Sequence, residues 1–337
     1  MTKPSVLPFS GQAATWEDAV SEAQGLVLSD KEQRLMDPIK LLGPDLWELK
    51  GNITKLLGGG HPFLSTMMTH FFSEDGRHIR PLAVLLMALS TSKQGIVPTQ
   101  RRVAEITQMI HTATLLHDDV LDGDAYASNK LAILAGDFLL ARASLALAHL
   151  RNSECVEVMA TCIANIVEGE FMHLSTNGPV DFDVLMQEYM KKTYMRTASL
   201  MALSCKASVV LGGLCTSSDE AQAAYEFGKH FGIAHQLMDD VLRATSPDTV
   251  LDLRSAPFLF AWQSMPDLRP LVEQGCTRPG DAEKARTLLY RSDGIKQALD
   301  LATTHSQRSI DAIANLAPSD ARAALVQLAK TVTSRTS

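Results

Sequence analysis

Asp118, Asp119 and Asp122 are the residues whose type and spacing point most directly to chemistry. Asp118 and Asp122 are four residues apart, so on a helix they lie on one face with Asp119 beside them. The flanking residues are apolar or small, and no nearby lysine or arginine balances the three negative charges. A hard cation, Mg²⁺ above all, would relieve this repulsion by bridging the carboxylates to a phosphorylated ligand.

A second acidic pair, Asp239 and Asp240, lies much later in the chain between Leu237-Met238 and Val241-Leu242. Most acidic pairs on helices are solvated surface residues. Two pairs that both interrupt apolar helices are better explained by a ligand that needs both of them. If the two clusters face each other, they can clamp a diphosphate through metal ions.

Basic residues that could contact phosphate lie outside these clusters. Arg77 and Arg80 are three residues apart at the start of a strongly apolar helix, where forked donors and unpaired N–H groups both favour an anion. The alternative is a pair of surface arginines. Arg196 precedes a small, apolar run and could reach into a cavity, whereas we expect Lys191 and Lys192 to be solvated.

The elements that must position these residues are helices. Nearly every segment has the three-to-four-residue apolar spacing of a helix, and strand-like alternation is nowhere sustained. With no repeat and no long linker, the sequence predicts a single all-α domain with long central helices. Four helices are clearest. The first is expected from a Thr99 cap through Gln100 to the first acidic cluster, and the second from Asp181 or Asp183 toward Leu211, where Gly212-Gly213 ends it. The third is expected from a Ser217 or Ser218 cap to Asp239-Asp240, and the fourth from a Ser319 cap through Asp320 to about Thr333.

The composition excludes several classes of protein. A net charge of −7 argues against nucleic acid as a partner. The five cysteines show no metal or redox spacing, so we interpret them as buried free thiols in a reducing compartment. Asp137 and Arg142 interrupt the most apolar run, Leu131 to Leu150, so a buried core helix is expected there rather than a membrane span. The first thirty residues carry more carboxylates than amines, unlike a secretory signal or a mitochondrial presequence.

Five stretches of the sequence together form a recognisable pattern. They are Gly76 to Pro81, Ile110 to Asp119, Lys130 to Ser144, Tyr194 to Leu200 and His235 to Asp240. In these stretches the chain resembles the trans-polyprenyl diphosphate synthases, and most closely the mitochondrial long-chain synthases that make the ubiquinone side chain. The resemblance covers roughly Asp37 to Ser334.

The resemblance implies an all-α, single-domain isoprenoid-synthase bundle with a central cavity in residues 37–337, after an N-terminal extension of residues 1–36. It implies a Mg²⁺-dependent prenyltransferase that condenses isopentenyl diphosphate onto an allylic diphosphate primer, giving a long-chain all-trans polyprenyl diphosphate for ubiquinone. Several Mg²⁺ ions bridged by diphosphate, a homodimer or hetero-oligomer, a mitochondrial location and peripheral membrane contact for product release are expected with it.

The same resemblance assigns roles to single residues. Arg196 stands where a lysine is usual, which keeps the charge but changes the donor geometry. The assigned sets are Asp118, Asp119, Asp122, Asp239 and Asp240 for metal, Arg77, Arg80 and His111 for isopentenyl diphosphate, and Arg196, Thr197 and Gln236 for the allylic diphosphate.

Product length is expected to depend on the helical turn beneath Asp118. Short-chain members of the family carry a bulky aromatic floor there, whereas this chain has Ala113 and Thr114. Met109 and Ile110, one turn lower, are flexible or aliphatic, so the tunnel for the growing chain is expected to be open. The alternative is that Ala113 only packs against another helix.

Two departures from the family pattern concern loops. A longer loop with paired arginines usually follows the first acidic motif, and here the chain passes almost at once from Asp124 to Asn129. The second motif usually continues to a further aspartate and a Gly- and Lys-containing loop, and here Arg243 follows. We interpret both short loops as residues missing from the sequence in hand rather than as true deletions.

Two other functions compete with self-sufficient elongation. A non-catalytic subunit that supports an active partner would explain Arg243 and the short loops, although the intact first motif opposes it. A terpene cyclase shares the first motif but would not need Arg77, Arg80 and His111 to bind a second diphosphate.

Overall fold

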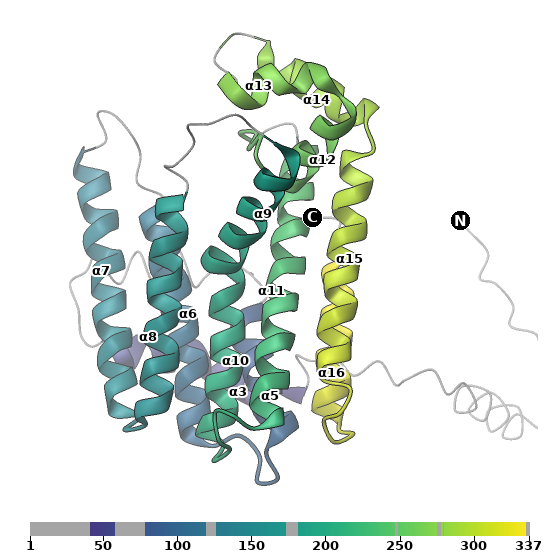
Figure 1. Cartoon of the computed structure of the whole chain (residues 1–337). Coiled ribbons are helices and arrows are strands. Elements are labelled where there is room, and N and C mark those ends of the chain that lie inside the picture. The colour runs from purple at the N-terminus through teal and green to yellow at the C-terminus, as the bar shows by residue number, and fades with distance from the viewer. Residues whose placement is uncertain are drawn as a thin grey trace, which may run out of the picture. The chain divides into compact units, whose positions relative to one another are not determined.

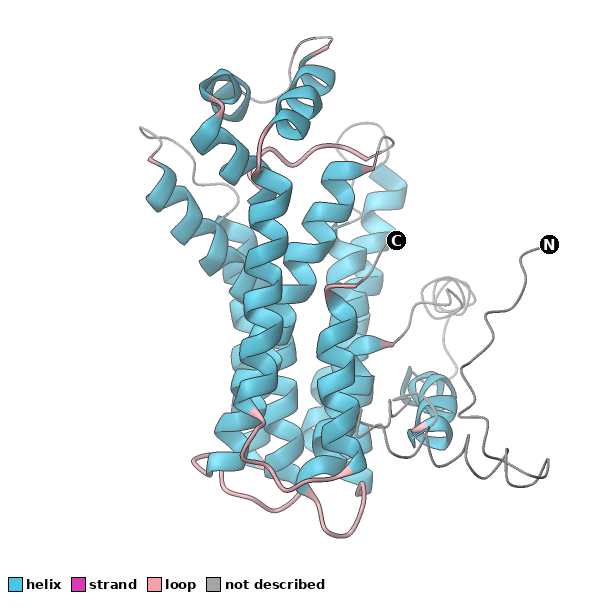
Figure 2. Cartoon of the chain, turned by 90° about the vertical axis from the view of Figure 1, so that its right-hand side faces the viewer, coloured by secondary structure: helices cyan, strands magenta, loops and turns pink. Residues whose placement is uncertain are grey.

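The computed structural model describes residues 41–57, 78–118, 126–172, 181–246, 249–274, 278 and 280–334. The chain divides into two compact units, Met1–Met36 and Asp37–Ser337, and all described residues belong to the second. Every regular element among them is helical, which confirms the predicted all-α class (Figures 1 and 2). The elements are α3 (Gly43–Leu57), α5 (Ile79–Thr91), α6 (Pro98–Asp118), α7 (Tyr126–His149), α8 (Ser153–Phe171), α9 (Phe182–Thr193), the π-helical turn η2 (Tyr194–Ala198), α10 (Ser199–Leu211), α11 (Asp219–Thr245), α12 (Ala256–Ser264), the 3₁₀ turn η3 (Pro266–Leu268), α13 (Arg269–Gln274), α14 (Asp281–Arg291), α15 (Gly294–Ala312) and α16 (Asp320–Val332).

Two of the four predicted helix starts are confirmed by side-chain caps, and a third helix, α9, begins after Asp181 without one. The Ser218 hydroxyl accepts from the Ala221 N–H at the start of α11, and Ser319 caps α16 in the same way. The predicted Thr99 cap of α6 is wrong, because the helix already begins at Pro98. Proline suits the first turn of a helix, where no N–H is needed for an intrahelical bond.

Helix α11 lies at the centre of the bundle and packs along α10 and α15 (Figure 1). Close approach to α10 depends on Gly228, where an added Cβ would lie 2.5 Å from the Met201 carbonyl oxygen. Phe227 and Phe231 stack beside this contact and are fully buried. This packing fixes the carboxyl-terminal half of α11, which carries the second acidic pair.

Helix α7 is less buried than the sequence predicts. Asn129–His149 is the one stretch of the described residues that is long and apolar enough to cross a membrane, although core helices of soluble proteins have the same property. It packs against α6, while Leu131, Leu134 and Leu145 remain exposed. The expected core helix is therefore buried on one face only. The expectation of buried cysteines is likewise wrong for Cys215, which is exposed.

A buried histidine pair joins α11 to α15. His230 Nδ1 and His305 Nδ1 are 2.9 Å apart, so one ring must donate and the other accept. Burial lowers the pKa of His305 to about 4, and His230, Arg308 and Lys229 lower it further. Burial also lowers the pKa of His230, against the nearby Glu226 carboxylate, which raises it. Both rings are therefore neutral at pH 7.

Acid should weaken the contact between α11 and α15 at this histidine pair. Between pH 6.5 and about 4 the unfolded chain binds a proton that folded His305 does not, so stability is complete above pH 6.5 and falls as the pH falls through this window. We expect a loss on the order of 2 kcal/mol. His305→Gln should flatten this part of the pH–stability curve in urea unfolding, whereas His149→Gln, at an exposed position, should leave it unchanged. If the free energy of unfolding falls equally steeply with pH in both variants, His305 is not the group responsible.

Candidate active site

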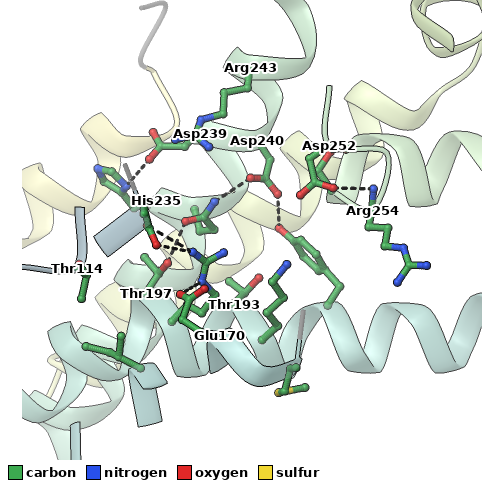
Figure 3. Close-up of a pocket in the computed structure, with 18 of the residues that line it drawn as sticks. Thr114, Glu170, Thr193, Thr197, His235, Asp239, Asp240, Arg243, Asp252 and Arg254 are labelled. Carbon is green, nitrogen blue, oxygen red and sulfur yellow. Dashed lines mark hydrogen bonds and ion pairs between the residues drawn. The ribbon is translucent and has the colours of Figure 1, made fainter. Parts of the chain in front are cut away.

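A cavity of about 600 Å³ opens where α6, α8, α9, η2 and α11 end near one another (Figure 3). It confirms the predicted central cavity of the bundle. Carboxylates and basic side chains from different helices line its polar part, and apolar side chains line the rest. The apolar lining includes Leu115, Ile166, Phe171, Leu185, Phe258 and Leu259.

Asp118, at the last turn of α6, faces the cavity and contacts Arg196 of η2. Arg196 Nη2 lies 3.3 Å from Asp118 Oδ1, and Arg196 Nε donates to the Glu170 carboxylate. One guanidinium thus balances two carboxylates from α6 and α8. Asp119 and Asp122 lie outside the described residues, so the rest of the predicted first motif stays a prediction.

Asp240 is held by a chain of hydrogen bonds across three helical segments. Thr197 Oγ1 donates to Gln236 Oε1 at 2.9 Å, and Gln236 Nε2 donates to Asp240 Oδ1 at 2.8 Å. The Tyr189 hydroxyl donates to Asp240 Oδ2 at 2.8 Å. Burial raises the pKa of Asp240 to about 6, although both hydrogen bonds oppose that rise, and the charge of Asp252 adds to it.

Asp239 faces the cavity beside Asp240 but has a different partner. Its Oδ2 lies 3.2 Å from His235 Nδ1, one helical turn earlier on α11. Arg243, one turn later, also lines the cavity (Figure 3). The second predicted acidic pair therefore lines the same cavity as Asp118, which is consistent with the clamp hypothesis.

Of the predicted basic pair Arg77 and Arg80, the structure describes only Arg80. Arg80 Nη1 donates to His111 Nε2 at 2.9 Å, which joins the start of α5 to α6. Burial, with the charges of Arg80 and His235, holds the pKa of His111 well below its usual value. His111 is therefore neutral and accepts from the guanidinium. Arg77 lies outside the described residues.

Several lining residues were not predicted as site residues. Lys192 lines the cavity, so the expectation that it is solvated is wrong, and its burial lowers its pKa. Tyr189 lies one helical turn before it, and Arg196 one turn after it. Counting back from the predicted Arg196 at this three-to-four-residue spacing along one helix face could have revealed Lys192 and Tyr189. Asp252 and Glu170 gave no signal, because loop geometry and a neighbouring helix bring them in.

The predicted tunnel residues occupy two different environments. Thr114 lines the cavity. Ala113, Met109 and Ile110 are fully buried within the α6 packing and lie outside the cavity lining. A tunnel along this face of α6 would therefore have to open beyond the present floor, and the prediction of its course stays untested.

The π-helical turn η2 sets the direction of Arg196 and Thr197. π turns recur at functional sites because they break the regular phase of a helix. Two glycines allow neighbouring helices to pack against the turn. A Cβ on Gly169 of α8 would lie 2.7 Å from Arg196 Cγ, and one on Gly232 of α11 would lie 2.6 Å from Ala198 Cα.

The donor set suits a hard divalent cation. Asp118, Asp239 and Asp240 present oxygen atoms to one cavity, as Mg²⁺ prefers. Within the described ranges, no group of three or more His, Cys, Asp or Glu side chains could hold an ion alone. Mg²⁺ often binds one or two carboxylates and completes its shell with water and substrate phosphate. These residues fit an ion that a diphosphate shares.

Comparison with known proteins decides the family. A family model described as Polyprenyl synthetase matches residues 61–256, more than half of the chain. The chain belongs to the polyprenyl synthetase family. The probable mitochondrial hexaprenyl pyrophosphate synthase of Neurospora crassa is 37% identical over 94% of this chain and 87% of its own length. The human all trans-polyprenyl-diphosphate synthase PDSS1 is 36% identical over 90% and 78%.

Solved structures of the family have the same fold. The apo form of an Arabidopsis medium/long-chain length prenyl pyrophosphate synthase is 35% identical with a TM-score of 0.73, covering 89% of this chain and 100% of that one. A Caulobacter crescentus polyprenyl synthase, complexed with calcium and isoprenyl diphosphate, is 26% identical with a TM-score of 0.79, covering 91% and 99%.

The two short loops were predicted to reflect residues missing from the sequence. The chain of 337 residues is continuous through both, so the interpretation that residues are missing is wrong. The alignment with the Neurospora relative spans 393 positions, more than this whole chain, so that relative carries additional segments. The described part of the second loop is well anchored. Thr249 Oγ1 donates to the Arg243 carbonyl at 2.5 Å, and Arg286 donates to the Thr249 carbonyl at 2.8 Å.

Filling the space beside η2 should destabilise the protein. Gly232→Ala places a methyl group against the Ala198 backbone, which cannot move without shifting η2, so we expect a loss of roughly 1–3 kcal/mol. Gly51→Ala on α3 is the matched control, because nothing lies within 4 Å of its added Cβ. It should be neutral or stabilising by up to about 1 kcal/mol. Thermal or urea unfolding measures both, and a neutral Gly232 variant would refute the close packing.

Proposed function

We propose that this protein is a Mg²⁺-dependent trans-polyprenyl diphosphate synthase. It condenses isopentenyl diphosphate with an allylic diphosphate and repeats the step to make a long-chain product for ubiquinone. The observation that carries the proposal is that Asp118 of α6, Asp239 and Asp240 of α11, and the basic residues Arg80 and Arg196 line one cavity. Residues 37–337 form the synthase domain and residues 1–36 an extension.

Two groups of basic residues would bind the two diphosphates. Arg80, with His111 as its acceptor, presents a guanidinium of fixed direction to isopentenyl diphosphate. Arg196 and Lys192 also line the cavity, and the allylic diphosphate would bind beside them. Thr197 donates a hydrogen bond to Gln236, and Gln236 donates one to Asp240, which keeps the Asp240 carboxylate oriented. Bound Mg²⁺ would neutralise the charge that grows on the departing diphosphate.

The reaction then needs an ionised allylic carbon beside the double bond of isopentenyl diphosphate. Cationic side chains stabilise the leaving diphosphate, so the allylic C–O bond breaks heterolytically. The double bond of isopentenyl diphosphate attacks the allylic carbon, and loss of a proton to the released diphosphate gives an allylic product one isoprene longer. Leu115, Phe171 and Leu259 provide apolar walls that exclude water from the cation.

Relatives named as mitochondrial synthases support a mitochondrial location, at the matrix or the inner-membrane face. A long apolar product must pass into a membrane, so peripheral membrane contact for product release belongs to the proposal.

A homodimer is the proposed assembly, and the relative named decaprenyl-diphosphate synthase subunit 1 supports a hetero-oligomer as the alternative.

Elongation by the isolated protein tests the function directly. The full-length chain is incubated with Mg²⁺, radiolabelled isopentenyl diphosphate and an allylic primer, and the products are resolved by length. We expect products of several added isoprene units, and at least a hundredfold loss of rate in Asp239→Ala. Activity that appears only after a partner protein is added would favour the supporting-subunit function. A cyclised hydrocarbon would identify a terpene cyclase.

The tunnel prediction concerns the floor below Asp118. Ala113→Phe should shorten the longest product by at least one isoprene unit, because an aromatic ring fills about one helical turn of the route. Since Ala113 is fully buried, its variant is compared with Thr114→Phe, whose side chain already faces the cavity. Unchanged product lengths in both folded variants would show that the chain grows along another path.

A further inference from the structure

Arg243 is a cation whose charge has no partner among the described residues. It lies on α11, one turn beyond Asp239 and Asp240, and lines the mouth of the cavity (Figure 3). Its side chain is exposed and makes no hydrogen bond or ion pair with the described residues, although several carboxylates line the same cavity. An arginine in such a field would normally pair with one of them.

Those carboxylates already have other donors. Asp239 lies beside His235, and Asp240 accepts from Tyr189 and Gln236. Asp252 accepts from the backbone N–H of Arg254 at 2.9 Å. The Arg243 guanidinium therefore stays available to an anion that enters the cavity.

The position of Arg243 is also fixed. It belongs to the central helix, and its carbonyl accepts from the Thr249 hydroxyl at 2.5 Å. Arg286 of α14 donates to the carbonyls of Ser246 and Thr249, which holds the described part of the loop after α11. These bonds fix the backbone from which the side chain extends, and the planar guanidinium can bind phosphate oxygens with two parallel donors.

We propose that Arg243 binds the allylic diphosphate directly and takes over part of the task that Mg²⁺ performs. A carboxylate at this point of the helix could reach a phosphate only through a cation. An arginine supplies the positive charge itself, so this chain should hold diphosphate with less help from metal. The inference rests on the proposed function, because it concerns the same cavity and the same ligand.

Binding of inorganic diphosphate, measured by isothermal titration calorimetry with Mg²⁺ and separately with EDTA, tests the role of Arg243. The wild-type protein should bind in EDTA, and Arg243→Gln should raise that Kd about tenfold, the effect of one charge-assisted contact. Arg243→Lys should recover part of the loss. Arg291→Gln, an exposed arginine on α14 away from the cavity, is the matched control and should bind like wild type.

Arg243→Asp gives the sharper result. It should abolish binding in EDTA and restore it only as Mg²⁺ is added, which shifts the Mg²⁺ dependence rather than the fold. Circular dichroism verifies that each variant is folded. An Arg243→Gln variant that binds like wild type in EDTA would overturn the inference and leave the proposed function standing. A wild-type protein that binds diphosphate under neither condition would instead contradict the proposed function.

Discussion

The repulsion among carboxylates that share one cavity is the constraint on which the rest of the site depends. Without ligand, each carboxylate needs a donor from a different part of the bundle. Arg196 serves Asp118, while Tyr189 and Gln236 serve Asp240. Even so, Asp240 is costly, since burial raises its pKa to about 6. The helices that carry the donors must therefore be held at fixed distances and directions from the helices that carry the acids.

The glycines and the π turn meet that requirement. Close packing at Gly228 and Gly232 brings α10 and η2 against α11, so that Thr197 reaches Gln236. The wider π turn changes the phase of the helix between α9 and α10. Tyr189, before the turn, and Arg196, within it, both line the cavity. Gly169 of α8 leaves room for the Arg196 side chain beside the turn.

The sequence predicted the fold class and much of the site for a physical reason. Apolar periodicity and caps such as Ser218 are local signals, and paired acids on apolar helices need an explanation wherever they occur. It could not show that Asp252 approaches Asp240, because a loop path has no periodicity. The exposed side of α7 was also missed, since composition measures hydrophobicity and not what covers it. Lys192 was misjudged as a surface lysine, because its burial depends on the helices opposite.

The charges also bear on whether the cavity is catalytic or a remnant in a supporting subunit. A subunit that binds no diphosphate gains nothing from a buried carboxylate such as Asp240, and replacing it would relieve strain. The same holds for the Arg80–His111 pair, in which burial forces a histidine to remain neutral beside a guanidinium. Both features lower stability unless a ligand uses them, a metal cation for Asp240 and a diphosphate for Arg80. Arg243 fits this logic as well, since an added cation offsets acidic charge in a cavity that must still receive a diphosphate.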